Sequence, residues 1–218
     1  MAPLLAYWSI RGLAQPIRLL LNYVGQEFED KKYDCGPPPN FDKSCWFNEK
    51  FSLGLDFPNL PYYIDEEVKL TQSGAIMRYL AEKHNLVPKK LTEKARMMTA
   101  EYQLADLRSE FVGLCYSPNH DALKDEFTKK LPDIFKAWSK FLGKNKWMSG
   151  DTLSYVDFNV YETFDHIRTF KEDIFNDYIN LKEYMDRFEA LPAISEYMKS
   201  EKFIKNPINN KMAKFGNE

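Results

Sequence analysis

Cysteine is scarce in this sequence. Only three of the 218 residues are cysteines, and Cys35, Cys45 and Cys115 are widely separated. An odd number of distant cysteines fits free thiols in a reducing compartment better than a disulfide framework. The chain also lacks a C-x-x-C pair, the pattern typical of thiol–disulfide exchange. A disulfide-stabilised secreted domain is therefore not expected.

Neither a strong charge imbalance nor a long apolar run is present. The 30 Lys and Arg residues nearly balance the 32 Asp and Glu residues, which gives a net charge of −2. Without a long basic run, a nucleic-acid partner is not indicated. No segment approaches the roughly 20 apolar residues of a membrane span, and residues 1–3 lack the basic start of a secretory signal. We therefore expect a cytoplasmic protein without membrane contact.

The residues that are present allow packed cores. A hydrophobic content of 44% over 218 residues is enough for one large or two modest domains. We find no internal repeat, and the proline run at residues 37–39 is the single low-complexity patch. The chain therefore reads as an ordinary globular protein.

The first part of the chain alternates strand and helix patterns. We expect a buried strand over residues 4–8 (LLAYW), a loop with Gly12 over residues 9–14, a helix over residues 15–21 opened by Pro16, and a strand over residues 28–33. After this strand we expect a loop with a helix, then a pair of strands, and then another helix. This is the order of a thioredoxin-like domain.

Residues 58–65 (PNLPYYID) and 70–76 (LTQSGAI) are the most informative stretch. Pro61 stands directly before a short strand pattern, which suggests a cis peptide bond. Such a bend would leave the backbone of Leu60 unpaired, so that an extended peptide could pair with it. Ser73 stands where an amphipathic helix begins, and free N–H groups at a helix start bind carboxylates. The two runs predict a site for a small acidic peptide.

From Leu91 onward only helical patterns occur. We expect Thr92 to cap a long helix that begins at Glu93 and ends near Tyr116. Asn119 should start a second helix that is kinked at Pro132. Ser154 and Asp157 form a capping signal, which on its own serves folding, and shorter helices are expected over residues 181–191 and 194–199. The predicted division is residues 1–83, a linker over residues 84–90, and an all-helical domain over residues 91–218.

Several motifs together resemble the cytosolic glutathione transferases, and specifically the mu class. They are residues 7–13 (YWSIRGL), residues 50–61 (KFSLGLDFPNLP), the insertion at residues 35–42, residues 114–116 (LCY) and residues 154–158 (SYVDF). The resemblance covers nearly the whole chain. It implies an α/β thioredoxin-like N-terminal domain with an all-α C-terminal domain. It also implies a detoxifying enzyme that adds the thiolate of reduced glutathione to hydrophobic electrophiles, with glutathione as co-substrate and no cofactor or metal.

The resemblance also implies where glutathione binds. Tyr7 matches the tyrosine that stabilises the thiolate, whose pKa must fall from about 8.5. A fall of about two units needs about 2.7 kcal/mol of preferential stabilisation. Taken alone, Tyr7 would be read as a buried core tyrosine. The other expected glutathione contacts are Trp8, Leu13, Lys43, Trp46, Lys50, Asn59, Leu60, Gln72, Ser73 and Asp106. In some relatives the position that matches Lys43 carries arginine, so Lys43 keeps the charge but loses the bidentate fork.

Two further residues imply a homodimer. Asp106 matches an aspartate that reaches the γ-glutamyl amine of glutathione in the neighbouring subunit, although an isolated helical carboxylate is usually just solvated. Phe57 matches a side chain that inserts into an apolar pocket between helices of the partner, and its alternative is a local core residue. Both assignments depend on a second copy of the chain.

The electrophile site is expected to differ from that of better-known members. Leu13 and Tyr116 match lining residues, and the Tyr116 hydroxyl could assist catalysis by hydrogen bonding to an acceptor or leaving group. Ala105, Ser109 and Asn209 stand where bulky apolar side chains are common. The pocket should therefore be roomier and more polar.

Two other functions stay open at this point. A non-catalytic carrier could use the same fold, although retention of Tyr7 argues for chemistry. A thiol–disulfide oxidoreductase is disfavoured, because residues 7–10 (YWSI) contain no cysteine near the helix start.

Overall fold

The N-terminal part of the chain forms a mixed sheet flanked by helices. The computed structural model describes residues 2–218, so Met1, the first residue of the predicted N-terminal domain, lies outside the described residues. The elements are β1 (Leu4–Trp8), α1 (Gln15–Tyr23), β2 (Glu29–Tyr33), α2 (Ser44–Phe47), β3 (Tyr62–Ile64), β4 (Lys69–Thr71) and α3 (Ser73–Lys83). The strand order is β2-β1-β3-β4, in which β1 is parallel to β2 and antiparallel to β3. The predicted thioredoxin-like order is confirmed.

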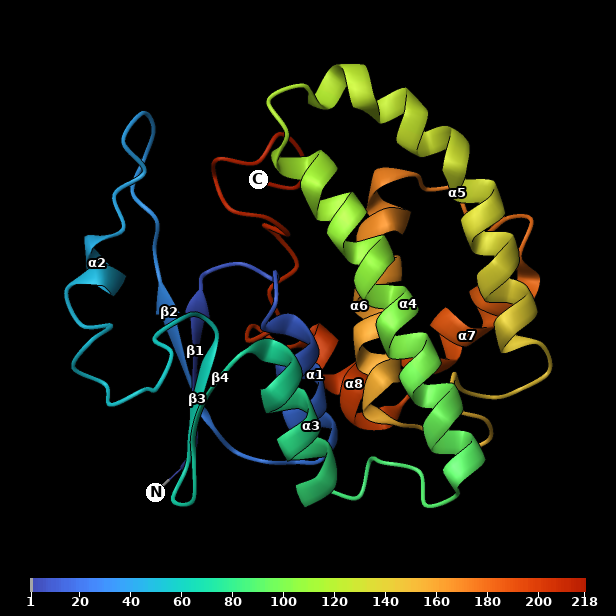
Figure 1. The fold of residues 1–218 in the computed structure, drawn as a ribbon, viewed down its shortest axis with the longest axis horizontal. Coiled ribbons are helices and arrows are strands. Elements are labelled where there is room, and N and C mark those ends of the chain that lie inside the picture. The colour runs from blue at the N-terminus through green and yellow to red at the C-terminus, as the bar shows by residue number, and fades with distance from the viewer. Residues whose placement is uncertain (1) are drawn as a thin grey trace.

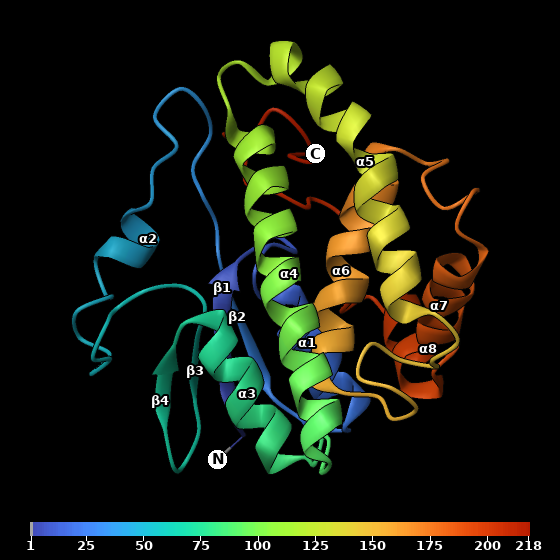
Figure 2. The same ribbon diagram turned by 45° about the vertical axis from the view of Figure 1, so that its right-hand side comes forward.

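Five helices follow and pack beside this unit. They are α4 (Leu91–Tyr116), α5 (His120–Leu142), α6 (Tyr155–Phe170), α7 (Ile179–Glu189) and α8 (Pro192–Lys199). Figures 1 and 2 show α1 and α3 between the sheet and this helical part, with α6 packed against both α1 and α4. No helix within residues 2–218 is long and apolar enough to span a membrane.

Some predicted helix ends are correct and others are not. Ser154 and Asp157 form the expected capping box, in which the Ser154 N–H donates to Asp157 Oδ2 at 2.9 Å. Thr92 is not the cap of α4, because the Lys94 N–H already bonds the Lys90 carbonyl and Thr92 lies within the first turn. Asn119 is the N-cap residue of α5, but its side chain makes no capping hydrogen bond. Both ends of β1, the start of α3 at Ser73 and the end of α4 at Tyr116 agree with expectation, whereas α1 ends two residues later than expected and α8 begins two residues earlier.

The kink expected in α5 stays a prediction. Pro132 lies inside this helix, which the structure assigns as one element from His120 to Leu142. In the C-terminal part, α7 begins and ends two residues earlier than the pattern over residues 181–191 suggested.

Two apolar clusters position the site. In β1, Leu5 belongs to the large core shared with the helices, whereas Ala6 belongs to a smaller one. The smaller cluster contains Tyr7, Trp46 and Leu60. The candidate site therefore lies where the small core meets α4.

Candidate functional site

Tyr7 lies near the end of β1 against the loop that follows it. Its side chain is only 7% exposed, and its hydroxyl accepts a hydrogen bond from the backbone N–H of Leu13. Burial raises the pKa of Tyr7, whereas the Leu13 hydrogen bond and the charges of Arg108 and Arg18 act to lower it. Tyr7 is therefore neutral at physiological pH and keeps a hydroxyl proton to donate.

Gly12 allows the loop to approach this tyrosine closely. Its φ is +46°, and a Cβ atom there would lie 2.6 Å from Tyr7 Cε1 and 2.9 Å from the Tyr7 hydroxyl. Any other residue would be strained in the backbone and would collide with the ring. The sequence analysis placed Gly12 in a loop but did not assign it this contact.

A cavity of about 380 Å³ opens beside Tyr7. It is lined by Tyr7, Ile10, Gly12, Leu13, Ala105, Arg108, Ser109, Val112, Tyr116 and Asn209. All five residues expected at the electrophile site therefore lie in one cavity with Tyr7.

Tyr116 and Asn209 are tied to the C-terminal segment. The Tyr116 hydroxyl accepts a hydrogen bond from the Asn210 N–H at 2.8 Å, so its own proton remains available to a ligand. Burial raises the pKa of Tyr116. Asn209 is 5% exposed, and its Nδ2 donates to the Phe215 carbonyl at 3.0 Å. The Asn209 amide nitrogen therefore already has a partner within the chain, so less of this side chain's polarity than expected is available to a ligand.

Arg108 is a cavity residue that the sequence analysis missed. It is half-buried, and within residues 2–218 its guanidinium has no hydrogen bond or ion pair. Burial lowers the pKa of Arg108, and nearby Tyr7, Glu162 and Tyr116 act in the opposite direction. Arg108 follows Ala105 by three positions on α4, so helical spacing from the predicted residues was the signal that could have found it.

The segment around Pro61 has the expected bend. The Leu60–Pro61 peptide bond is cis, as predicted. The Leu60 N–H is not unpaired, however, because the neighbouring Asn59 side chain accepts it at 2.9 Å. The short Asx-type bond competes with strand addition, so an incoming peptide must share or replace it.

The start of α3 is where the sequence predicted it. Ser73 is the first helical residue, and the N-cap residue Gln72 makes no side-chain capping bond. Gln72 has a φ of +71°, which is uncommon for a residue with a side chain. The N-terminal amides of α3 are thus left without a side-chain cap, which suits an anion.

An aromatic group lies next to this region. Trp46 stacks on Tyr62 with ring centroids 5.9 Å apart, and Tyr33 contacts both Trp8 and Trp46 edge-on. Lys50 Nζ lies 5.9 Å from the Trp46 ring centroid. These contacts bring both expected tryptophans and Lys50 into one neighbourhood.

Three expected residues stand apart from these groups. Lys43 is the N-cap residue of α2, without an ion pair within residues 2–218. Asp106 is exposed on α4, and Phe57 is 75% exposed. Neither Asp106 nor Phe57 lines the cavity beside Tyr7.

Comparisons with known proteins agree with this geometry. The family models described as "Glutathione S-transferase, N-terminal domain" and "Glutathione S-transferase, C-terminal domain" match residues 3–82 and 105–201. The chain is 49% identical to Glutathione S-transferase Mu 2 of Macaca fascicularis, covering 98% of each chain. It is also 46% identical to Glutathione S-transferase Mu 1 of Rattus norvegicus over the full length of both.

Solved structures show the same architecture. The crystal structure of the glutathione S-transferase Blo t 8 superposes with a TM-score of 0.83 and 33% identity, covering 98% of this chain and 99% of that one. The pi-class enzyme of Onchocerca volvulus gives a TM-score of 0.86 at 28% identity, covering 98% of this chain and 100% of that one. Together with the full-length mu relatives, these matches show that the chain belongs to the glutathione S-transferase family and is a glutathione transferase of the mu class.

Proposed function

We propose that the cavity beside Tyr7 is where the glutathione thiolate meets the electrophile. The observation that carries this assignment is the neutral, buried Tyr7, whose hydroxyl accepts from Leu13 and so has its proton free for a third atom. A sulfur anion at that position would receive a charge-assisted hydrogen bond. This favours the thiolate over the thiol and lowers the thiol pKa.

The rest of glutathione would extend from this point along the N-terminal domain. Leu60 and Asn59 would pair with the cysteinyl unit, while Gln72 and the start of α3 at Ser73 would bind the γ-glutamyl carboxylate. The support is the cis bend at Pro61 together with the absence of a side-chain cap on α3. The glycyl carboxylate would lie near Trp8, Trp46, Lys50 and Lys43, and Leu13 would pack against the thiol side.

The electrophile would occupy the part of the cavity formed by α4 and the C-terminal segment. Tyr116 would donate its free proton to an acceptor or leaving group of a hydrophobic electrophile, the role that general acid catalysis requires. Ala105 and Ser109 would leave room for larger substrates, Asn209 would line the far side, and Arg108 would face any negative charge. Conjugation of this kind would serve detoxification.

A homodimer would complete the glutathione site. An apolar cavity of about 420 Å³ lies between α4 and α5, and Phe57 is exposed and lies outside it. The cavity is lined by Thr99, Ala100, Gln103, Asp133, Ile134, Ala137, Trp138 and Phe141. We assign Phe57 of a second copy as its occupant, which would also let Asp106 reach the neighbour's glutathione.

The domain limits and the compartment are further parts of the proposal. Residues 1–83 would bind glutathione, residues 84–90 would act as a linker, and residues 91–218 would supply most of the electrophile site. Cys35, Cys45 and Cys115 are all free cysteines, which suits the reducing cytoplasm.

The decisive experiment is a pH titration of the bound thiol in Tyr7→Phe. We expect nearly unchanged glutathione binding, a rise of about two units in the thiol pKa, and slow turnover at neutral pH with an activated aryl halide. Tyr79→Phe is the matched control, because the Tyr79 hydroxyl binds Asp65 at 2.8 Å and does not line the cavity. An unchanged thiol pKa in Tyr7→Phe would remove Tyr7 from this role, and a wild-type protein without turnover would indicate a carrier.

A further inference from the structure

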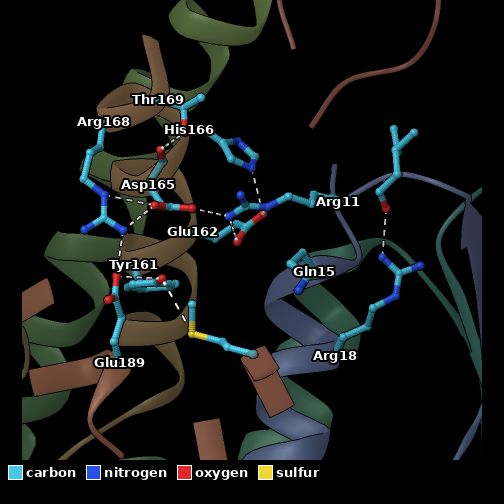
Figure 3. A network of polar contacts seen from close by, with 12 residues as sticks. Arg11, Gln15, Arg18, Tyr161, Glu162, Asp165, His166, Arg168, Thr169 and Glu189 are labelled. Carbon is cyan, nitrogen blue, oxygen red and sulfur yellow. Dashed lines mark hydrogen bonds and ion pairs between the residues drawn. The ribbon is translucent and has the colours of Figure 1, made fainter. Parts of the chain in front are cut away.

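The loop over residues 9–14 is anchored to α6 by a buried arginine. Arg11 is 3% exposed, and its guanidinium donates from Nε to Glu162 Oε1 at 2.9 Å and from Nη2 to Glu162 Oε2 at 2.8 Å (Figure 3). Nη2 also donates to Asp165 Oδ2 at 2.6 Å. A bidentate pair of this kind fixes the orientation as well as the distance of both groups.

Glu162 is held from a second side by His166. Its Oε1 accepts from His166 Nε2 at 2.7 Å, and both side chains are almost fully buried. Burial acts to raise the pKa of Glu162, but the charge of Arg11 and the hydrogen bonds from Arg11 and His166 outweigh it and hold that pKa at about 2. Burial lowers the pKa of His166, so that its ring is neutral at pH 7 and Nε2 carries the proton toward the carboxylate.

The backbone of the same loop is also hydrogen-bonded on two sides. The Arg11 N–H donates to the Pro207 carbonyl and the Gly12 N–H to the Ile208 carbonyl, each at 3.0 Å. On the other side, Arg18 Nη1 donates to the Ile10 carbonyl at 2.9 Å. The loop therefore has little freedom to move while these bonds and the Arg11 pair are intact.

This loop is what contacts the hydroxyl of Tyr7. The Leu13 N–H donates to that hydroxyl, and Gly12 is close enough that an added Cβ would touch it. The direction in which Tyr7 can offer its own proton depends on where Leu13 lies. A displacement of the loop would therefore turn the proton away from the sulfur.

We propose that Arg11 and Glu162 are positioning residues for the reaction, and that His166 steadies Glu162 in this role. The pair would hold the loop in place, and through the Leu13 N–H would aim the Tyr7 hydroxyl at the glutathione thiolate. The inference rests on the proposed role of Tyr7. Small errors in such geometry can cost about a hundredfold in rate.

The test compares Glu162→Gln with Glu189→Gln. Glu189 accepts from Arg168 Nη2 at 2.6 Å and from the Tyr161 hydroxyl at 3.0 Å, so it belongs to the same network without contacting Arg11 (Figure 3). The measurement is the ultraviolet absorbance of the thiolate of bound glutathione against pH. We expect the thiol pKa to rise by about one unit in Glu162→Gln, which is about tenfold less thiolate at pH values well below the thiol pKa, and to stay unchanged in Glu189→Gln.

Steady-state kinetics separate positioning from binding. A positioning role predicts that kcat measured well below the thiol pKa falls about tenfold in Glu162→Gln while the KM for glutathione changes little. Arg11→Lys keeps the charge but loses the fork, so its thiol pKa should lie between those of wild type and Glu162→Gln.

A second variant covers the case in which Glu162→Gln does not fold. Arg11→Met combined with Glu162→Leu replaces the buried pair by apolar side chains of similar size, a change that is often neutral for stability. If this folded double variant, or folded Glu162→Gln, keeps the wild-type thiol pKa while Tyr7→Phe shifts it, the positioning role is wrong and the role of Tyr7 stands. If Tyr7→Phe shifts nothing either, both proposals fail.

Discussion

Arg11 belongs to the loop that packs against Tyr7 and Arg108 lines the cavity beside Tyr7, yet the surroundings of their charges are opposite. Arg11 is buried and makes three hydrogen bonds to two carboxylates of α6. Arg108 is half-buried on α4, lines the cavity beside Tyr7, and has no such partner within residues 2–218. The pKa of Arg11 is raised by its carboxylates despite burial, whereas burial lowers that of Arg108.

The difference indicates that Arg11 stabilises the structure, whereas Arg108 is placed to contact a ligand. Buried charges in folded proteins are almost always paired, because an unpaired one loses its hydration without compensation. Arg11 follows this rule, because its charge is paired with carboxylates of α6, and it can therefore hold the loop over residues 9–14 against that helix. Arg108 departs from it at a cavity wall, so the missing counter-charge is best supplied by a ligand.

The largest expected effect is on stability. Arg11→Leu would leave Glu162 buried and without its main partner, so we expect the free energy of unfolding to fall by about 3–5 kcal/mol. Arg108→Leu removes a charge that has no partner, so the free energy of unfolding should change by less than about 1 kcal/mol. Urea unfolding of both variants at one protein concentration measures the contrast. Equal losses of unfolding free energy in the two variants would contradict the contrast between Arg11 and Arg108.

The same distinction between groups that are paired within the chain and groups that await a partner applies to apolar side chains. Phe57 is exposed while the cavity between α4 and α5 is lined by Trp138 and Phe141. If Phe57 of one copy occupies this cavity of a second copy, Phe57→Ala should weaken the dimer by on the order of 3 kcal/mol or more.

Sedimentation over a range of concentrations measures this association. Phe51→Ala is the control, because Phe51 is 79% exposed and is not assigned to that cavity. A wild-type protein that is monomeric and active at assay concentration would contradict the dimer, and an equal loss in Phe51→Ala would point to a general effect of exposed aromatics.

Local patterns made much of the fold predictable. The capping box at Ser154 and Asp157, the helix start at Ser73 and the cis bond before Pro61 each involve residues close in sequence, and each is present. The start of α4 was wrong because two positions compete as caps, and Lys90 was the one that stayed extended while Thr92 entered the helix. Propensity alone does not decide between such neighbours.

Long-range contacts were not accessible in the same way. Arg11 and Glu162 are 151 positions apart, and nothing in either local pattern indicates their pairing. The free Leu60 N–H was a wrong expectation, because the side chain of Asn59 takes it. Arg108 lies on the same face of α4 as the predicted residues Ala105 and Ser109. It was missed because the site residues were predicted only at positions that match the family.

The last prediction concerns what Arg108 recognises, and its effect should be the smallest. A half-buried guanidinium facing a cavity should favour electrophiles that carry a carboxylate, and a hydrogen bond between charged groups contributes about 1.5–3 kcal/mol. We therefore expect Arg108→Leu to lower the ratio of kcat/KM for 4-chloro-3-nitrobenzoate to that for 1-chloro-2,4-dinitrobenzene by about tenfold, equal to about 1.4 kcal/mol. Arg108→Lys should retain part of the preference, because it keeps the charge but not the planar fork. The two substrates differ mainly in one charged group, so an unchanged ratio in Arg108→Leu would mean that the unpaired charge plays no part in choosing the electrophile, and the contrast with Arg11 would then concern stability alone.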